Sequence, residues 1–217
     1  MAGPSPETIP GPTRVIIDVK SDKVDDWKEE YKQFLLSVKD SNGYFRYRWG
    51  PWSEDMSKLE IIATWLPSEN LTTFGSSEHH QRAVDAIKPV LKEMPAKCPR
   101  FDFDLKTMRP PPQEIVDCAV CEIITVSQFT GDPAAMAEQL KKAESNTGCL
   151  ATHSGVAATN TPDKGTIWLG FVGWTSEKLS LAADKSTYIP AGVGEVESHH
   201  TNFNFPIKGF SVTNPGR

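Results

Sequence analysis

The 217-residue sequence has no apolar stretch near the roughly 20 residues that a membrane-spanning helix needs, so a membrane-embedded protein is not expected. Positive charge is scarce as well: the net charge is -5 and the pI ≈ 5.6, which argues against a nucleic-acid partner held by a broad basic surface. Four cysteines are too few for a disulfide framework at this length. We therefore expect an acidic cytoplasmic protein with an apolar core, and neither a nucleic acid nor a membrane as its partner.

The sequence also lacks the motifs of P-loop NTPases, dinucleotide-binding folds, zinc proteases and α/β-hydrolases. Cys118 and Cys121 form a lone CxxC, and no second pair completes a zinc site. If both lie in one strand, residues three apart point to opposite faces. We interpret all four cysteines as reduced core residues and expect neither a metal nor a cofactor.

Two segments divide the chain. Residues 1–12 are rich in proline and glycine and lack the regions of a secretory signal, which predicts a flexible arm. That arm is a lid, a partner-binding arm or a plain tail. Residues 109–113 carry three consecutive prolines that cannot continue a strand, which predicts a linker. The sequence thus predicts a first unit at 13–108 and a second at 114–217.

Both units repeat one order of elements. In the first unit, alternating and helical spacings predict strands at 13–20, 44–49, 59–65 and 101–105, and helices at 22–39 and 68–94. In the second unit they predict strands at 117–126, 149–158, 166–174 and 202–207, a helix at 133–145 and a shortened helix from 177. Trp65 and Trp174 end equivalent strands, and Asn42-Gly43 matches Thr147-Gly148.

The order β-α-β-β-α-β is the ferredoxin-like split βαβ arrangement, which places its helices on one sheet face only. The other face needs a partner. The predicted class is therefore α+β, with two ferredoxin-like repeats facing each other as an intramolecular pseudo-dimeric α/β barrel.

Two stretches carry a family resemblance: the Trp65-Leu-Pro-Ser-Glu sequence, and Ser77-Glu78-His79-His80-Gln81. They resemble the antibiotic-biosynthesis monooxygenase and stress-responsive families of the dimeric α/β-barrel superfamily. The resemblance covers residues 13–107, whereas the second unit matches by element order and by Trp174. It implies one of several roles: oxidation of phenolic or anthrone-like substrates without metal or flavin, cyclisation or isomerisation, haem binding, or no catalysis.

Candidate catalytic residues are His79, Arg46 and His153. We expect His79, early in a long helix, to face the barrel mouth as a proton acceptor. His153 has small neighbours in its strand, which leave room for a ligand. The alternative is that both histidines only pack against their neighbours or face solvent.

Strand alternation selects candidate substrate-binding residues. Tyr44, Arg46 and Arg48 share one face of their strand, and the aromatic residues between them suit the helix-covered face. Acidic residues on the corresponding faces of other strands are expected to line the same space between the sheets; the alternative is that these faces are solvated. Tryptophans at the strand ends predict an aromatic wall for the pocket. The predicted substrate-binding set is Trp65, Tyr44, Arg48, Asp18, Asp104 and Trp174, with Asp102 as a further lining residue.

These features predict a cofactor-independent enzyme for a small apolar or aromatic molecule, acting by proton abstraction followed by oxygenation, cyclisation or rearrangement. A non-catalytic ligand-binding or stress-associated barrel is the first alternative. A haem protein, with His79, His153 or His199 as axial ligand, is the second. We expect the site mainly in the first unit, with 186–198 as a movable entrance, and we count a second copy of the chain, as a homodimer, among the candidate partners.

Overall fold

The computed structural model describes residues 11–40, 44–65, 74–93, 103–104, 111–159 and 165–203. In the first unit, the strands are β1 (Gly11–Asp18), β2 (Tyr44–Pro51), β3 (Lys58–Trp65) and β4 (Phe103–Asp104), and the helices are α1 (Lys28–Lys39) and α3 (Glu78–Ile87). Short 3-10 turns, η2 (Val24–Asp26) and η3 (Lys88–Val90), flank these helices. Residues 1–10 of the predicted 1–12 arm, most of the predicted 101–105 strand and parts of the predicted 68–94 helix lie outside the described residues, and β1 already begins at Gly11.

The second unit follows the same order. Its strands are β5 (Val120–Ser127), β6 (Cys149–Thr159), β7 (Ile167–Trp174) and β8 (Glu195–Thr201). Its helices are α5 (Pro133–Leu140) and α6 (Glu177–Ala182), followed by the 3-10 turns η4 (Lys141–Ser145) and η6 (Lys185–Thr187). A further short helix, α4 (Gln113–Val116), connects the units. None of the helices within the described residues has the length and apolar character required to cross a bilayer.

The strands are antiparallel and run in the order β2-β3-β1-β4-β6-β7-β5-β8. The two-residue β4 pairs with both β1 and β6 and so joins the two units. At the far ends of this order, Trp52 and Thr201 form an isolated antiparallel bridge. The class is α+β, as the sequence predicts.

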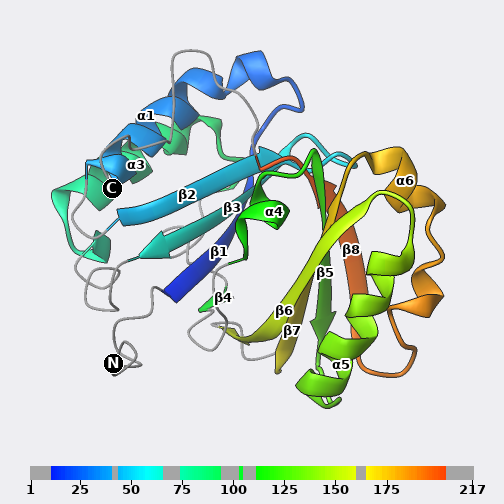
Figure 1. The fold of residues 1–217 in the computed structure, drawn as a ribbon. Coiled ribbons are helices and arrows are strands. Elements are labelled where there is room, and N and C mark those ends of the chain that lie inside the picture. The colour runs from blue at the N-terminus through cyan, green and yellow to red at the C-terminus, as the bar shows by residue number, and fades with distance from the viewer. Residues whose placement is uncertain are drawn as a thin grey trace, which may run out of the picture.

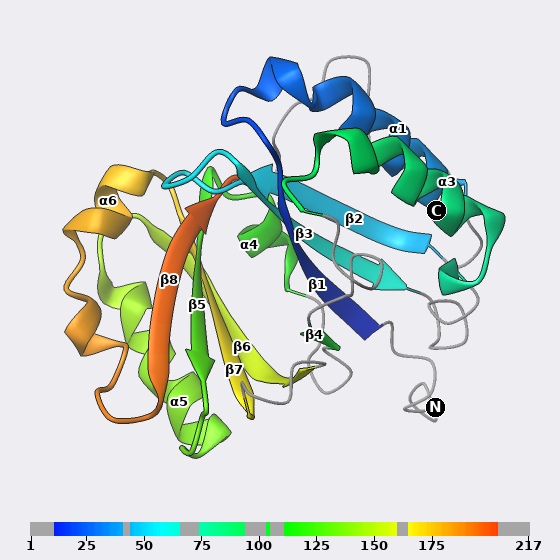
Figure 2. The same cartoon turned by 180° about the vertical axis from the view of Figure 1, so that it is seen from behind.

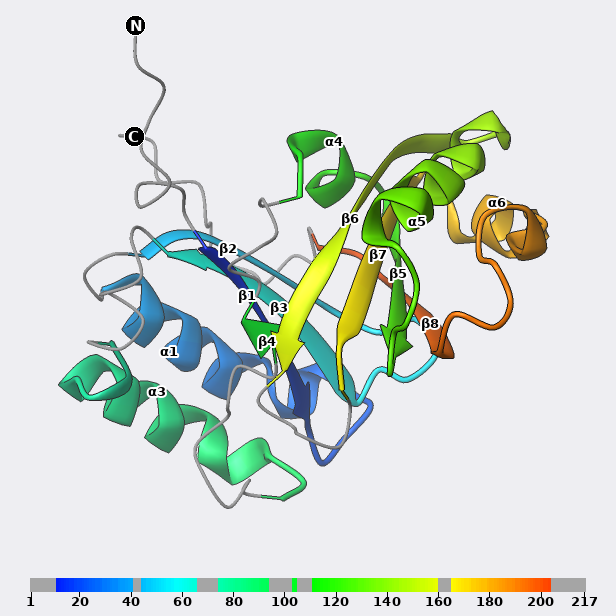
Figure 3. The same cartoon turned by 90° about the horizontal axis from the view of Figure 1, so that it is seen from below.

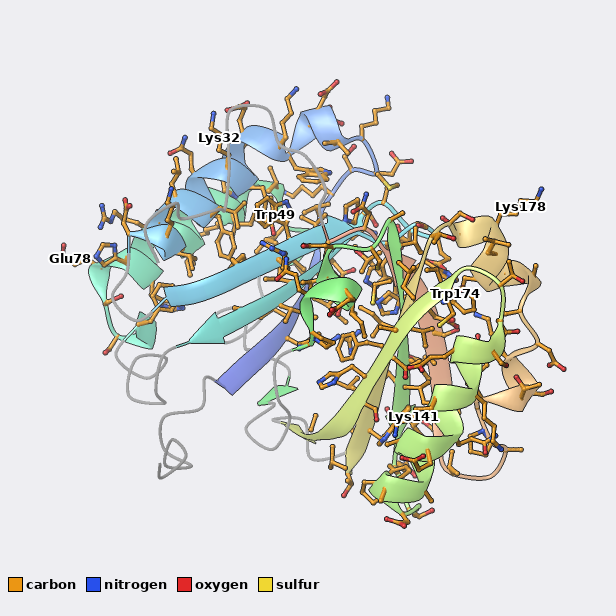
Figure 4. All side chains as sticks on the ribbon, viewed as in Figure 1. Lys32, Trp49, Glu78, Lys141, Trp174 and Lys178 are labelled. Carbon is orange, nitrogen blue, oxygen red and sulfur yellow. The ribbon has the colours of Figure 1, made fainter. Side chains whose placement is uncertain are left out.

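Helices cover the outer face of each group of strands (Figures 1 and 2). α1 and α3 lie on β1–β3, while α5 and α6 lie on the outer side of β5–β8. The opposite, inner faces are turned toward each other, with α4 between them at one end (Figure 3). In Figure 4, Trp49 and Trp174 lie beneath helices, whereas Lys32, Glu78 and Lys178 project outward.

The periodicity of the sequence accounts for these layers. α1 buries Tyr31, Phe34, Leu35 and Val38, which recur at helical spacing, against the outer face of β2. Tyr47 and Trp49 of β2 belong to the same buried cluster, which confirms that the aromatic face of this strand lies under the helices.

A second buried cluster fills the space between the inner faces. It includes Ile62 from the first unit, Ile123 and Phe171 from the second, and Ile115 of α4. This cluster therefore contains residues of both units, while each unit has a further buried cluster of its own under its helices.

Two predicted strand boundaries differ from the structure. Separately, Gln113 at the end of the predicted linker is the first residue of α4, and Pro112 is its N-cap. β5 starts at Val120, so Cys118 lies before the strand and not within it. A strand that the sequence does not predict, β8, ends directly before the predicted strand at 202–207 and contains His199 and His200, whereas residues 204–207 lie outside the described part of the chain. The first four residues of β8 are all exposed, and Val196 is the one apolar residue among them. The strand therefore shows no alternation of apolar and polar residues that would have predicted it.

Candidate functional site

Five side chains meet between the inner faces and form what we call the inner polar cluster: Arg14, Trp52, Glu60, Thr125 and His199. Arg14 Nε and Nη2 donate to the two oxygens of Glu60, the latter bond being 3.1 Å, and Nη1 donates to Thr125 Oγ1 at 3.2 Å. His199 Nε2 lies 3.1 Å and Trp52 Nε1 3.0 Å from Glu60 Oε2. The cluster draws residues from both units.

The Glu60 carboxylate is fully buried and accepts from four N–H groups. Burial alone raises the pKa of this carboxyl, but the Arg14 guanidinium and the hydrogen bond from His199 outweigh it and lower the pKa to about 2. Glu60 is therefore an anion at neutral pH, compensated by an equally buried cation.

The charge on Glu60 sets the tautomer of His199. A carboxylate can only accept, so Nε2 of His199 must carry a proton. In the neutral ring Nδ1 then holds the lone pair, and no described residue is hydrogen-bonded to it. The ring of Trp52 stacks on His199 with centroids 3.7 Å apart and planes 17° apart. The result is a basic nitrogen, oriented by an anion, beside an aromatic face.

The second unit has no equivalent of this cluster. The two units can be aligned by their strand registers, because Trp65 pairs with Gly11 in the first and Trp174 pairs with Val120 in the second. In this alignment, Arg14 corresponds to Ile123 and Glu60 corresponds to Leu169. Likewise β4 places Phe103 beside Arg14, where β8 places His199 beside Ile123. Every charged member has an apolar counterpart, so the described part of the chain builds one such cluster rather than two.

A second polar group, here called the outer polar cluster, lies on the opposite face of β5 and β8. Its centre is the fully buried carboxylate of Glu122. Four donors reach it: Lys185 Nζ at 2.6 Å, Ser180 Oγ and Tyr188 Oη each at 3.1 Å, and Trp174 Nε1 at 3.3 Å. These bonds tie the segment after α6 to β5, so the part of the predicted entrance nearest α6 is anchored.

His200 extends the outer polar cluster toward solvent. Its Nε2 lies 2.8 Å from Ser180 Oγ, and its Nδ1 lies 2.5 Å from Glu54 Oε1. A Ser–His–Glu chain resembles an activated nucleophile in outline. Ser180 is fully buried, however, and its hydroxyl already lies against the Glu122 carboxylate, which disfavours the negative charge that attack would require. We interpret this chain as structural.

The helix histidines lie on the outer layer, on α3. His79 is half-buried and its Nδ1 lies 2.9 Å from Arg82 Nη2. His80 instead shares the helix face of Ala83, Val84 and Ile87, and its ring meets Phe74 edge-on at 5.2 Å. Burial lowers the pKa of His80. The structure thus separates His79 from the inner faces, contrary to the expectation that it faces a barrel mouth.

The other predicted residues are dispersed. Asp18 is exposed and pairs with Lys58 at 2.9 Å, because it ends β1 at the surface. Arg48 lies on β2 and reaches Asp117 at 3.4 Å. His153 is half-buried on β6, opposite Phe171. Trp174 belongs to the outer polar cluster.

For four of the remaining predicted residues the structure describes the strand on which they lie but not their side chains, and for a fifth it describes neither. Tyr44 and Arg46 lie on β2, Trp65 on β3 and Asp104 on β4, whereas Asp102 is not described.

The cysteines differ from the expectation in one respect. Cys118 precedes β5, and a hydrogen bond with Cys121 is the main cause that lowers the pKa of the Cys118 thiol. The two thiols are therefore neighbours in the buried cluster between the inner faces of the sheets, not residues on opposite faces of one strand. Within the described residues, no group of three or more His, Cys, Asp or Glu side chains could hold a metal ion.

Two of the three candidate haem ligands, His199 and His79, each have one ring nitrogen engaged within the protein. An axial ligand needs a ring nitrogen directed into open space. Nε2 of His199 binds Glu60 and its ring is covered by Trp52, while Nδ1 of His79 lies against Arg82. We therefore derive no chemical step through haem.

Sequence reasoning missed Arg14 and Glu60 as candidate site residues, although it included Trp52 among the tryptophans that could line an aromatic pocket. Arg14 and Glu60 interrupt apolar strands at 14–19 and 59–63, and a charge within such a strand was the available signal. Their partnership spans 46 residues and that of Glu60 with His199 spans 139, so local spacing could not reveal either.

No protein-family model matches the sequence, and no curated protein matches it. Among solved structures, an anthrone oxidase-like protein matches with 12% identity and a TM-score of 0.61, over 91% of this chain and 92% of that one. A candidate monooxygenase from Fusobacterium nucleatum subsp. nucleatum matches with 10% identity and a TM-score of 0.57, over 90% and 92%. A candidate chlorite dismutase matches with 10% identity and a TM-score of 0.52, over 89% and 94%. The chain therefore shares its overall fold with these structures.

Proposed function

We propose that the protein is a cofactor-independent enzyme that oxidises a flat, largely apolar substrate, with His199 as the general base. The observation that carries this proposal is the Glu60–His199 pair, in which an anion orients the imidazole and leaves Nδ1 as a proton acceptor. We further propose that the two units close as one intramolecular pseudo-dimeric barrel around this pair, as the Trp52–Thr201 bridge suggests.

The chemistry follows from these positions. Nδ1 of His199 takes a proton from an acidic carbon of the substrate, and the Glu60 carboxylate stabilises the imidazolium that forms. The resulting carbanion is electron-rich enough to react with dioxygen. For an anthrone the balance is one CH₂ group plus O₂ giving one carbonyl group plus water. The apolar surroundings, including Ile62, Ile123 and Phe171, suit a planar hydrocarbon framework.

Anthrone is the first substrate to test, since the similar anthrone oxidase-like structure names that chemistry. Oxygen consumption and quinone absorbance are followed for the full chain and for His199→Gln, whose amide still donates to Glu60 but offers no basic nitrogen. We expect the enzymatic rate to fall by ~10²–10⁴-fold, as is typical for loss of a general base. His79→Ala, on the outer helix, is the matched control and should retain the rate.

A His199→Gln protein as active as the parent would contradict this assignment. Loss of activity in His79→Ala, or in Arg46→Ala or His153→Ala alone, would return the site to the residues proposed from sequence. If a co-purified ligand identified by mass spectrometry is recovered unchanged and anthrone is not oxidised, the protein is a binding barrel. A Soret band on haem addition would support the haem alternative.

A further inference from the structure

The turn between β2 and β3, residues 52–57, reaches across to the other unit; we call it the cover turn. Besides the Trp52–Thr201 bridge, Ser53 N donates to His200 O at 2.8 Å and Thr201 Oγ1 donates to Pro51 O at 3.1 Å. The strands on either side are held by continuous ladders to β1 and to each other. The cover turn is held on β8 by individual bonds, and its last residue, Ser57, is bonded to the first unit through the backbone N–H of Val19 at 2.8 Å.

Trp52, the first residue of the cover turn, covers one face of the His199 ring. Its indole is half-buried, stacks on the His199 ring and donates to Glu60. His199 is only 5% exposed and Glu60 is 0% exposed. Trp52 is the described side chain that lies flat against this ring, so a planar molecule can stack on the same face of His199 only after Trp52 moves.

Glu54 makes the most contacts of any cover-turn side chain with β8. Its two carboxylate oxygens accept from the backbone N–H of His200 at 3.1 and 3.0 Å, and Oε1 also lies 2.5 Å from His200 Nδ1. Yet its side chain is 44% exposed. A solvent-accessible side chain can exchange such bonds for water more readily than the buried Arg14–Glu60 pair can.

Glu54 is deprotonated when it accepts these hydrogen bonds from His200. Burial raises the pKa of Glu54, but the hydrogen bonds from the backbone and ring of His200 outweigh it and lower the pKa overall. The carboxylate is thus charged at neutral pH. On the other side of His200, Ser180 and, behind it, Glu122 with Lys185 face the ring from α6, β5 and η6.

We propose that the cover turn is a hinged cover over His199 and that Glu54 is the positioning residue that keeps it closed. Opening lifts Trp52 from His199 and uncovers a flat aromatic slot, which Trp52 then closes by stacking on the bound substrate. This deepens the proposed function, since the base and the ligand class come from there. A planar ligand gains by replacing the Trp52–His199 stack, which shifts the equilibrium toward the open form.

Hydrogen exchange of the full chain without ligand tests the cover. We expect Glu54→Ala to speed exchange in residues 51–58 about tenfold or more, because hydrogen bonds to a charged group are lost. Glu54→Gln, whose amide oxygen still accepts from His200 N–H, should have a smaller effect. Glu195→Gln, on the exposed start of β8, is the matched control and should leave exchange unchanged.

Unchanged exchange at 51–58 in Glu54→Ala would overturn the proposal. So would faster exchange spread evenly over both units, which indicates general destabilisation instead of local opening.

Ligand entry gives the readout that a purely structural role would not change. Anthrone is added without oxygen, and its association is followed by quenching of Trp52 fluorescence, taken as the difference from the matching Trp52→Phe protein. We expect a faster association rate in Glu54→Ala; an unchanged or slower rate would contradict the cover.

The two proposals fail separately. If Glu54→Ala opens the turn but anthrone is never oxidised, the cover stands and the enzyme assignment falls. If His199→Gln abolishes oxidation while exchange and association are unaffected by Glu54→Ala, the reverse holds.

Discussion

Glu60 places a negative charge where no water reaches it, and its stability depends on Arg14. Breaking a buried ion pair on one side leaves the other charge uncompensated, which costs about 3–5 kcal/mol. We therefore expect Glu60→Leu to lower the free energy of unfolding by about that amount at pH 7, as measured by urea denaturation. The double variant Arg14→Met/Glu60→Leu should recover most of it, because the matching positions of the second unit are already apolar. A double variant no more stable than the single one would contradict this account.

The same carboxyl makes stability depend on pH. Its folded-state pKa of about 2 lies below the ordinary value of 4.5, so its contribution is complete above pH 4.5 and is lost as pH falls toward 2. We expect the unfolding free energy of the parent to fall through this window more steeply than that of Arg14→Met/Glu60→Leu. Parallel pH profiles for the two proteins would show that Glu60 is not the group responsible.

Sequence identified some single residues and not others for a physical reason. The aromatic alternation of β2 is a local pattern, and Tyr47 and Trp49 lie under α1 as it indicates. Arg14, Glu60 and His199 come from three separate strands, and only the folded topology brings them together. The sequence points to His79 and His80 because they are adjacent in the chain. His199 is placed for chemistry by its hydrogen bond to Glu60, which is distant in sequence.

At the scale of single elements, the end of β2 lies so close to the residue that follows β8 that position 50 requires glycine. A Cβ on Gly50 would lie 2.1 Å from the backbone oxygen of Asn202. We expect Gly50→Ala to destabilise the protein by about 1–3 kcal/mol, as overpacking does. Gly75 has no atom within 4 Å of such a Cβ, so Gly75→Ala is the control and should be neutral or slightly stabilising. Thermal unfolding of both variants makes the comparison.

Most elements of the sheet and helix layers could be predicted because their apolar spacing is regular, as in α1 and β7. β8 could not, because its first four residues are exposed and the last three are buried by contacts from the other unit. α4 could not either, since its four residues carry too little periodicity, and Ile115 gains its burial from the inner core.

At the scale of the whole molecule, the two units depend on each other. The Arg14–Thr125, Glu54–His200 and Glu60–His199 contacts all cross between them. Cutting the chain at Pro111 should therefore give halves that aggregate alone but reassociate when co-expressed. Size-exclusion chromatography and circular dichroism of each half and of the pair make the test. Two monomeric, cooperatively folding halves would refute the shared core.

The apolar residues that stand in the second unit where the first has Arg14 and Glu60 have an evolutionary consequence. A homodimer of single units is bound by its twofold axis to carry two identical copies of whatever lies between its sheets. Once two such units are fused, mutation can act on each copy independently. One copy can then keep a costly buried charge pair for chemistry, while Ile123 and Leu169 in the other are selected for packing alone.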